Sequence, residues 1–242
     1  TLVDQENEPW ASWRQMLPRF LNDQISVANH AESGLSANTF ISGNRLKKII
    51  SQMKKGDYVF VEFGHNDQKQ KGAGKGAYYS FMTYLKTFID EVQAKGGNPV
   101  LITPTRRRRF NKEGRTVNTH GEYPDAVRWI AAKENVPLID LNNMTGTLYE
   151  ALGESESKKA FVHYPMGSFS GQKKELADNT HFNPYGAYQI AKCVIEGMKK
   201  VTPELTKYLK TDISYNPSQP DKAETFLWCP APFCEMEKPD GN

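Results

Sequence analysis

Two polar segments that lie far apart in the sequence carry side chains able to hydrolyse an ester. The first is Asp178-Asn179-Thr180-His181, just before a predicted helix. A histidine in this position could take a proton from a nucleophile, while the Asp178 carboxylate fixes its tautomer and stabilises the imidazolium. The second is Gly64-His65-Asn66-Asp67, after a predicted strand, where the Asn66 side-chain amide could donate a hydrogen bond to a developing oxyanion.

Each segment has a simpler explanation when it is taken alone. An aspartate followed three residues later by a histidine is most often a helix N-cap with the histidine in solvent. The run 64–67 by itself is most often a turn that follows a strand. Both segments together, in this order and at the ends of strands, favour a hydrolytic site over two unrelated turns.

A metal hydrolase is the alternative for the same region. Ligand types suitable for zinc occur at His65, His163, Asp178 and His181, but the sequence lacks a His-x-x-x-His or Cys-x-x-Cys pair. We therefore expect neither a metal nor another cofactor. The other two histidines, His30 and His120, are flanked by small polar residues. They are expected to be structural, with their hydrogen bonds satisfied inside the protein.

Length and composition place the chain among ordinary globular proteins. Its 242 residues suffice for one large α/β domain. A net charge of +3 with 24% charged residues gives no reason to expect nucleic-acid binding. No apolar run reaches the roughly 18 residues that suggest a membrane span. Of the three cysteines, Cys193 is expected to be a small buried hydrophobe, whereas Cys229 and Cys234 could pair if the protein is secreted.

Short β-rich runs alternate with amphipathic stretches, which is typical of a parallel sheet covered by helices. Strands are predicted at 25–29, 58–63, 99–103 and 138–141. Helices are predicted at 10–21, 42–55, 78–95, 121–134 and 185–200, the last beginning at Asn183-Pro184. We expect a domain over residues 1–210, followed by a polar, Pro-rich tail or linker over 211–242.

Four strands do not complete a doubly wound sheet of the flavodoxin type. In that order the first strand lies inside the sheet, between its second and third strands. Each buried N–H or C=O group without a partner costs about 1–3 kcal/mol, so the edges beside this position need a strand. Since the chain starts at Thr1 without a methionine, we expect a trimmed or processed start. The inner strand would then come from a segment upstream of Thr1 or from another chain.

Several blocks in order resemble the rhamnogalacturonan acetylesterase family of SGNH (GDSL) hydrolases. The similarity covers roughly residues 1–200, and the ordered set is far more specific than any one block. The blocks are 1–10, Trp13-Arg14-Gln15-Met16-Leu17-Pro18, Asn29-His30-Ala31-Glu32-Ser33-Gly34, Phe63-Gly64-His65-Asn66-Asp67, Pro104-Thr105-Arg106-Arg107-Arg108, Asn118-Thr119-His120-Gly121 and Asp178-Asn179-Thr180-His181.

The resemblance implies a three-layer α/β/α fold and a serine nucleophile at the end of the first strand, immediately before the residue matched by Thr1. It assigns His181 as general base and then acid, with Asp178 as its orienting partner. The backbone N–H of Gly34 and the side chain of Asn66 would be oxyanion donors, beside the N–H of that serine. Ser33 is disfavoured as the nucleophile, because the same block supplies the oxyanion glycine.

The substrate is expected to be an acetylated acidic polysaccharide or oligosaccharide. Arg106 to Arg109 follows a predicted strand end, and planar guanidinium groups match carboxylates in a bidentate manner. Arg106 and Arg107 are the predicted galacturonate ligands, and a solvated loop is the other interpretation of this run. Aromatic residues beside the predicted site could stack on sugar rings: Trp10, Trp13, Tyr78, Tyr79, Tyr164 and Phe169. The polar stretches 71–80 and 163–177 offer no apolar lid for a lipase.

We therefore expect a serine esterase that removes acetyl groups from plant cell-wall polysaccharide, pectic rhamnogalacturonan in particular, through an acyl-enzyme. A secreted or periplasmic location would suit that substrate. The alternative from another class is a catalytically inactive relative that binds the carbohydrate without cleaving it. The residue encoded before Thr1 discriminates between the two.

Overall fold

The centre of the fold is a parallel sheet in the computed structural model, which describes residues 4, 8–211 and 213–228. Its strands are β1 (Tyr58–Glu62), β2 (Asn98–Ile102) and β3 (Leu138–Ile139), in the order β1-β2-β3. Val61 pairs with Leu101, and Leu101 in turn pairs with Leu138. The three predicted strands from 58 onward are therefore confirmed, and they bring the loops after β1 and β2 to one edge of the sheet.

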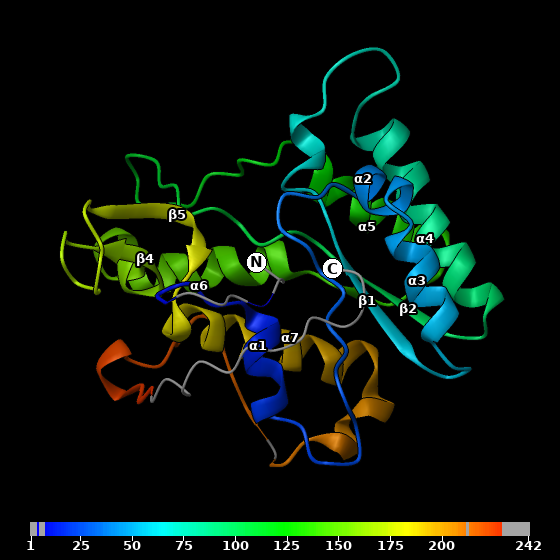
Figure 1. Ribbon diagram of the computed structural model, residues 1–242. Helices are drawn as coiled ribbons and strands as arrows, with labels where there is room; N and C mark the ends of the chain where they lie inside the picture. Colours follow the sequence, from blue (N-terminus) through cyan, green and yellow to red (C-terminus); the bar gives the residue numbers. More distant parts are fainter. Residues whose placement is uncertain (1–3, 5–7, 212, 229–242) are drawn as a thin grey trace.

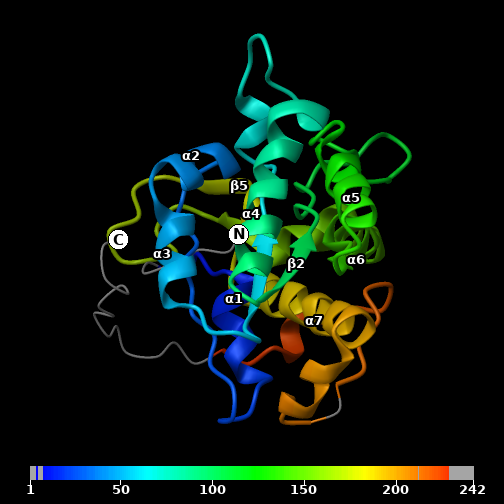
Figure 2. The ribbon, with the colours of Figure 1, turned by 90° about the vertical axis from the view of Figure 1, so that its right-hand side faces the viewer.

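Helices cover both faces of this sheet, as Figures 1 and 2 show. Along β2, Val100 and Ile102 belong to one hydrophobic cluster and Leu101 to the other, because successive side chains point to opposite faces. The first cluster includes side chains of α1 (Trp13–Met16), α6 (Leu141–Glu156) and α7 (Pro184–Val201). The second includes those of α2 (Ala37–Ser42), α3 (Arg45–Gln52), α4 (Met82–Ala94) and α5 (Tyr123–Lys133). The predicted three-layer α/β/α architecture is confirmed.

An antiparallel hairpin that the sequence pattern did not predict lies beside this sheet. It consists of β4 (Phe161–Tyr164) and β5 (Leu176–Phe182), with an irregular register between Phe161 and Val162. Phe182 also forms an isolated bridge with Ala11. Asp178 pairs with Val162 and Phe182 with Phe161, so residues 179–181 lie in the irregular part of the strand between these two pairs. The sequence of β5 is mostly polar, so it lacks the alternation of apolar and polar residues from which a strand is usually predicted.

Three of the predicted elements need correction, and one helix was not predicted. Residues 25–29 form no strand, and within the described residues they have no ladder partner. The helix predicted at 42–55 is two helices, because Gly43 ends α2 and Asn44 adopts a left-handed conformation with φ of 59°. α6 was not predicted, since its Asn, Thr and Gly residues have low helix propensity. The helix predicted at 10–21 is α1 followed by a short 3₁₀ turn, η1 (Leu17–Arg19).

The long C-terminal helix α7 begins as predicted. Asn183 caps it by accepting a hydrogen bond from the Gly186 N–H, with Pro184 in the first turn. Cys193 within this helix is fully buried, as expected. Cys229 and Cys234 lie outside the described residues. In the part of the chain that the structure describes, no helix is both long and apolar enough to cross a membrane.

Part of the predicted tail packs against the domain. Tyr215 is buried in the first cluster, and Phe226 and Trp228 pack against it. Tyr185 donates a hydrogen bond to the Asp221 carbonyl. The remaining short helices are η2 (Asp67–Lys69), η3 (Ala77–Phe81), η4 (Ser157–Ala160), η5 (Pro203–Tyr208) and η6 (Ala223–Thr225).

Candidate active site

The Asp178 and His181 side chains are in contact on β5. His181 Nδ1 lies 2.7 Å from Asp178 Oδ2, and the other carboxylate oxygen accepts the backbone N–H groups of Thr180 at 2.7 Å and His181 at 3.0 Å. Because an ionised carboxylate only accepts, the neutral ring carries its proton on Nδ1 and leaves Nε2 as the acceptor. The His181 side chain is 45% exposed, so Nε2 can be reached by a reacting group.

The Asp178 carboxylate is held in its ionised form. Partial burial on its own would raise its pKa, but the hydrogen bonds from the His181 ring and from two backbone N–H groups outweigh that effect and lower the pKa to about 2. Asp178 therefore remains an anion throughout the neutral range. A fixed anion at Nδ1 favours the imidazolium that forms when Nε2 takes a proton.

Asn66 lies on the loop that follows β1, with its side-chain amide directed to a second loop. Its Nδ2 donates to the Leu35 carbonyl at 3.1 Å, and its Oδ1 accepts from Lys69 Nζ at 2.8 Å. The amide nitrogen carries two hydrogens, so one donor is left beyond the contact with Leu35. Gly64 begins this loop with φ of 134°, and a Cβ there would lie 2.9 Å from Pro104 Cγ. The position therefore requires glycine.

Asp67 joins the Asn66 loop to the segment that carries Gly34. Its carboxylate accepts the N–H of Gly64 at 3.0 Å and the N–H of Ala37, the first residue of α2, at 2.8 Å. Gly34 has φ of 77°, a conformation that glycine adopts without cost. The segment 34–37 is thus tied to the loop after β1 at two points, Leu35 and Ala37. The sequence analysis assigned no role to Asp67. Its position in a turn directly after Asn66 could have indicated a carboxylate that holds this turn in place.

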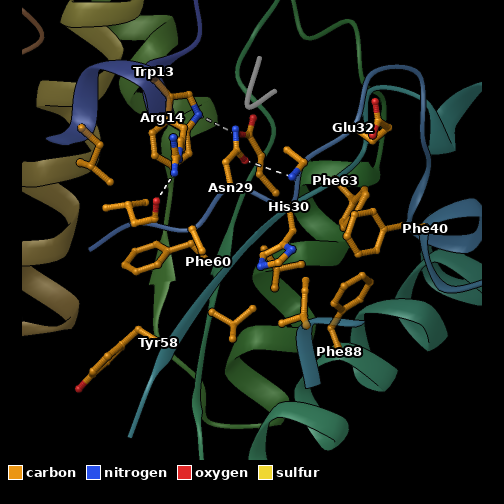
Figure 3. A pocket seen from close by; sticks show the side chains of 18 of the residues that line it. Trp13, Arg14, Asn29, His30, Glu32, Phe40, Tyr58, Phe60, Phe63 and Phe88 are labelled. Carbon is orange, nitrogen blue, oxygen red and sulfur yellow. Dashed lines mark hydrogen bonds between the residues drawn. The ribbon is translucent and has the colours of Figure 1, made fainter. Parts of the chain in front are cut away.

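One cavity of about 880 Å³ brings the predicted residues together. Gly34, Asn66 and His181 all line it, although they come from three different segments. Figure 3 shows the part between the β1 side chains of Tyr58 and Phe60 and the segment that carries Asn29 and His30. Ser33 also lines this cavity, but the structure gives no hydrogen bond between its hydroxyl and the His181 ring.

The predicted carbohydrate ligands Arg106 and Arg107 do not line this cavity. Arg106 donates to Thr116 and Asn142, and Arg107 donates to Thr119 and to the His65 carbonyl. Both guanidinium groups hold the loop after β2 to the domain. Arg108 is buried and donates to Ser157 and Asn179. Substrate binding by Arg106 and Arg107 stays a prediction. The other interpretation, a solvated loop, is wrong for Arg106, Arg107 and Arg108, because their guanidinium groups are hydrogen-bonded to the protein.

His65 and His120 form a ring pair next to this loop, with centroids 4.5 Å apart and planes at 70°. Burial lowers the pKa of both, that of His120 to about 3, so both rings are neutral. His120 is structural, as predicted, but within the described residues neither of its ring nitrogens has a hydrogen-bond partner. The expectation of satisfied hydrogen bonds was wrong for His120, because the pair packs ring against ring.

The described residues contain no group of three or more His, Cys, Asp or Glu side chains arranged to hold a metal ion. His163, the further ligand type named for zinc, contacts Asn179 through Nε2 at 2.9 Å. His30 is half-buried, and burial lowers its pKa.

Comparison with known proteins places this geometry in a family. The model of the GDSL-like Lipase/Acylhydrolase family matches residues 2–188. The chain is 40% identical over 201 residues to rhamnogalacturonan acetylesterase RhgT of Bacillus subtilis, covering 83% of this chain and 86% of RhgT. It is 32% identical over 209 residues to the probable rhamnogalacturonan acetylesterase YesY of the same organism, covering 86% of this chain and 91% of YesY.

A solved structure agrees with the fold. The crystal structure of the Bacillus subtilis protein YxiM superposes with a TM-score of 0.66 at 26% identity, covering 80% of this chain and 51% of that one. The family match extends over most of the sequence and includes the segments that carry Gly34, Asn66 and His181. The chain belongs to the GDSL-like Lipase/Acylhydrolase family.

Proposed function

We propose that this protein is a serine esterase that removes acetyl groups from pectic rhamnogalacturonan. The observation that carries the proposal is that the His181 ring, held by Asp178, lines one cavity together with Asn66 and Gly34. The 40% identity to a protein named rhamnogalacturonan acetylesterase supports the substrate class. RhgT and YesY are both named as esterases, so the inactive carbohydrate-binding alternative gains no support from them.

In the proposed reaction the nucleophile is a serine immediately before Thr1. His181 Nε2 takes the hydroxyl proton while the serine oxygen forms a bond to the acetyl carbon. The carbonyl electron pair moves to its oxygen, which accepts hydrogen bonds from the Gly34 N–H and the Asn66 amide. When this intermediate collapses, the sugar oxygen leaves and takes the proton from His181. Water then repeats the sequence on the acyl-enzyme and releases acetate.

The same cavity suits the strand that would carry this serine. β1 forms one wall, and its edge facing the cavity has no strand partner among the described residues. Residues 25–29, which form no ladder, line the cavity as well. Tyr58 and Phe60 pack with the first hydrophobic cluster, whereas Phe63 and Phe88 belong with the second. An apolar strand placed beside β1 would be buried on both faces, as inner parallel strands are.

Acetate release tests this function. The protein extended by its native residues before Thr1 should release acetate from acetylated rhamnogalacturonan oligosaccharides. His181→Ala should reduce the rate by about 10³-fold or more with folding intact, because the base is lost. His163→Ala is the matched control, since this histidine lies on the neighbouring strand β4 and does not line the cavity. Normal turnover by His181→Ala would refute the assignment, and oligosaccharide binding without acetate release would support the inactive alternative.

A further inference from the structure

A positively charged loop begins beside the site, and in it only Ala77, near its end, is buried in the second hydrophobic cluster. We name residues 69–79 the lysine arm. It leaves the body at η2 and returns at η3, and these two short helices pack against each other. Figures 1 and 2 show it projecting from the top of the molecule, before α4. The first residue of the arm donates from Lys69 Nζ to Asn66 Oδ1 at 2.8 Å, so the arm begins in contact with the candidate oxyanion donor.

The charge of the arm is uniform. Lys69, Lys71 and Lys75 lie within seven residues, and no acidic residue occurs between Asp67 and Asp90. Lys71 is exposed, and neither Lys71 nor Lys75 takes part in an ion pair with the described residues. Arg106, Arg107 and Arg108, by contrast, donate hydrogen bonds from their guanidinium groups to other groups of the protein. The lysine arm therefore offers cationic groups next to the site that are not already committed to the fold.

The lysine arm ends, just before α4, in two residues with aromatic side chains, Tyr78 and Tyr79. Tyr78 and Tyr79 are 41% and 72% exposed, whereas Phe81 is buried and packs on Tyr123. The backbone of Tyr79 departs from the helical conformation, with φ of −115° and ψ of −105°. A Cβ on Gly76 would lie 3.4 Å from Tyr79 Cδ2, so the edge of the ring lies over this glycine. The same loop therefore carries two exposed aromatic rings, Tyr78 and Tyr79, and the lysines Lys71 and Lys75. Such a combination suits a ligand that has both flat rings and negative charges.

We propose that the lysine arm is a binding subsite for the acidic sugar chain of the substrate. Tyr79, with Tyr78 beside it, stacks on a sugar ring through its apolar face. Lys71 and Lys75 pair with uronate carboxylates, and Lys69 links the subsite to the loop of Asn66. The proposal rests on the proposed function and deepens it, since it names the part of the protein that recognises the acidic carrier while the acetyl group occupies the site.

Kinetics with two substrates test the subsite in the N-terminally extended protein. Tyr79→Ala should raise KM for acetylated rhamnogalacturonan oligosaccharides about 5–10-fold, as expected for loss of one aromatic contact, and leave turnover of p-nitrophenyl acetate unchanged. Tyr79→Phe should restore the low KM, because the ring face remains. The double substitution Lys71→Gln, Lys75→Gln should raise the same KM and weaken its dependence on salt.

Trp129, an exposed aromatic residue outside the lysine arm, provides a matched control. It is 46% exposed on α5, and Lys133 Nζ lies 4.8 Å from its ring centroid. Trp129→Ala and Lys133→Gln should leave KM for both substrates as in the wild type. Unchanged KM for the oligosaccharide in the Tyr79 and lysine variants, with p-nitrophenyl acetate still hydrolysed, would overturn the subsite alone. Failure of the wild type to hydrolyse p-nitrophenyl acetate would overturn the proposed function instead.

Discussion

At the residue scale, the balance between burial and hydrogen bonding shifts the pKa values of Asp67 and Asp178 in opposite directions. Asp178 accepts a ring N–H and two backbone N–H groups, which together outweigh its burial and lower its pKa. Asp67 accepts two backbone N–H groups, but its deeper burial dominates and raises its pKa to about 6. Asp178 thus stays charged to orient His181, whereas Asp67 is charged only near neutrality and above.

Asp67 should make stability depend on pH. Its folded pKa of about 6 exceeds the ordinary value of 3.8, so the folded state favours the protonated form. The wild-type free energy of unfolding, relative to Asp67→Asn, should be highest below pH 4 and fall by about 2–3 kcal/mol as pH rises through 6. Urea unfolding at pH 4, 5, 6 and 7 measures this difference. Asp57→Asn, in an exposed turn, controls for loss of one charge, and a difference that does not change with pH would contradict the prediction.

Asn66 should act mainly in the transition state. Asn66→Ala should lower kcat by roughly 10²–10³-fold with little change in KM, because an oxyanion donor is used only when charge develops on the carbonyl oxygen. Steady-state kinetics with p-nitrophenyl acetate give both constants. Lys69→Gln is the control, since it removes the partner of Asn66 Oδ1 but keeps the donor. An effect confined to KM would mean that Asn66 only binds substrate.

At the scale of elements, the hairpin β4–β5 carries the Asp178–His181 pair and is anchored to α7. Phe182 ends β5, and Asn183 caps α7 directly after it. The Asn183 amide also donates to the Lys159 carbonyl and to the Tyr164 hydroxyl on β4. Gly186 lies so close to the chain before β4 that a Cβ would be 1.8 Å from the Ala160 carbonyl oxygen. The position of the Asp178–His181 pair therefore depends on a helix start that lies outside the cavity.

Gly186→Ala should separate α7 from the hairpin. The added methyl group meets backbone rather than a flexible side chain, so the substitution should destabilise the protein by about 1–3 kcal/mol and lower esterase activity as the pair moves. Thermal unfolding and p-nitrophenyl acetate turnover report the two effects. Lys200→Ala, in the exposed last turn of the same helix, should change neither. An unaltered melting temperature for Gly186→Ala would contradict the close packing.

At the scale of the whole molecule, the two hydrophobic clusters meet across the sheet, and the cavity beside β1 lies between them. We expect a strand upstream of Thr1 to fill this cavity, because β1 would gain a ladder and both clusters would gain apolar contacts. The same strand would bring the serine to the edge where Gly34, Asn66 and His181 lie.

A comparison of two forms of the protein tests this arrangement. The form with about ten native residues before Thr1 should unfold cooperatively at a higher temperature and hydrolyse p-nitrophenyl acetate. The form that begins at Thr1 should be inactive and less stable, or should gain activity when the upstream segment is added as a separate peptide by strand addition. Cooperative folding and full activity of the form beginning at Thr1 would mean that Ser33 or another residue is the nucleophile.

The local sequence was enough to predict the elements and the chemistry that rest on short-range patterns. The apolar runs of β1 and β2, the start of α7 at Asn183-Pro184 and the three-residue spacing of Asp178 and His181 all act between near neighbours. Such patterns depend on backbone periodicity and capping, which a single sequence displays. The ordered blocks likewise identified the family, because each block is a run of neighbouring residues that needs no distant partner to be recognised.

Only the tertiary structure decided features that depend on distant partners. Residues 25–29 have a strand-like sequence but no ladder, and the polar β5 is a strand because β4 pairs with it. Asp67 joins two loops that are 30 residues apart, and the arginines after β2 bond to side chains from other elements. A polar side chain stabilises the fold or contacts a substrate depending on which groups lie next to it in the folded protein. Spacing along the sequence does not identify those groups when they come from distant segments.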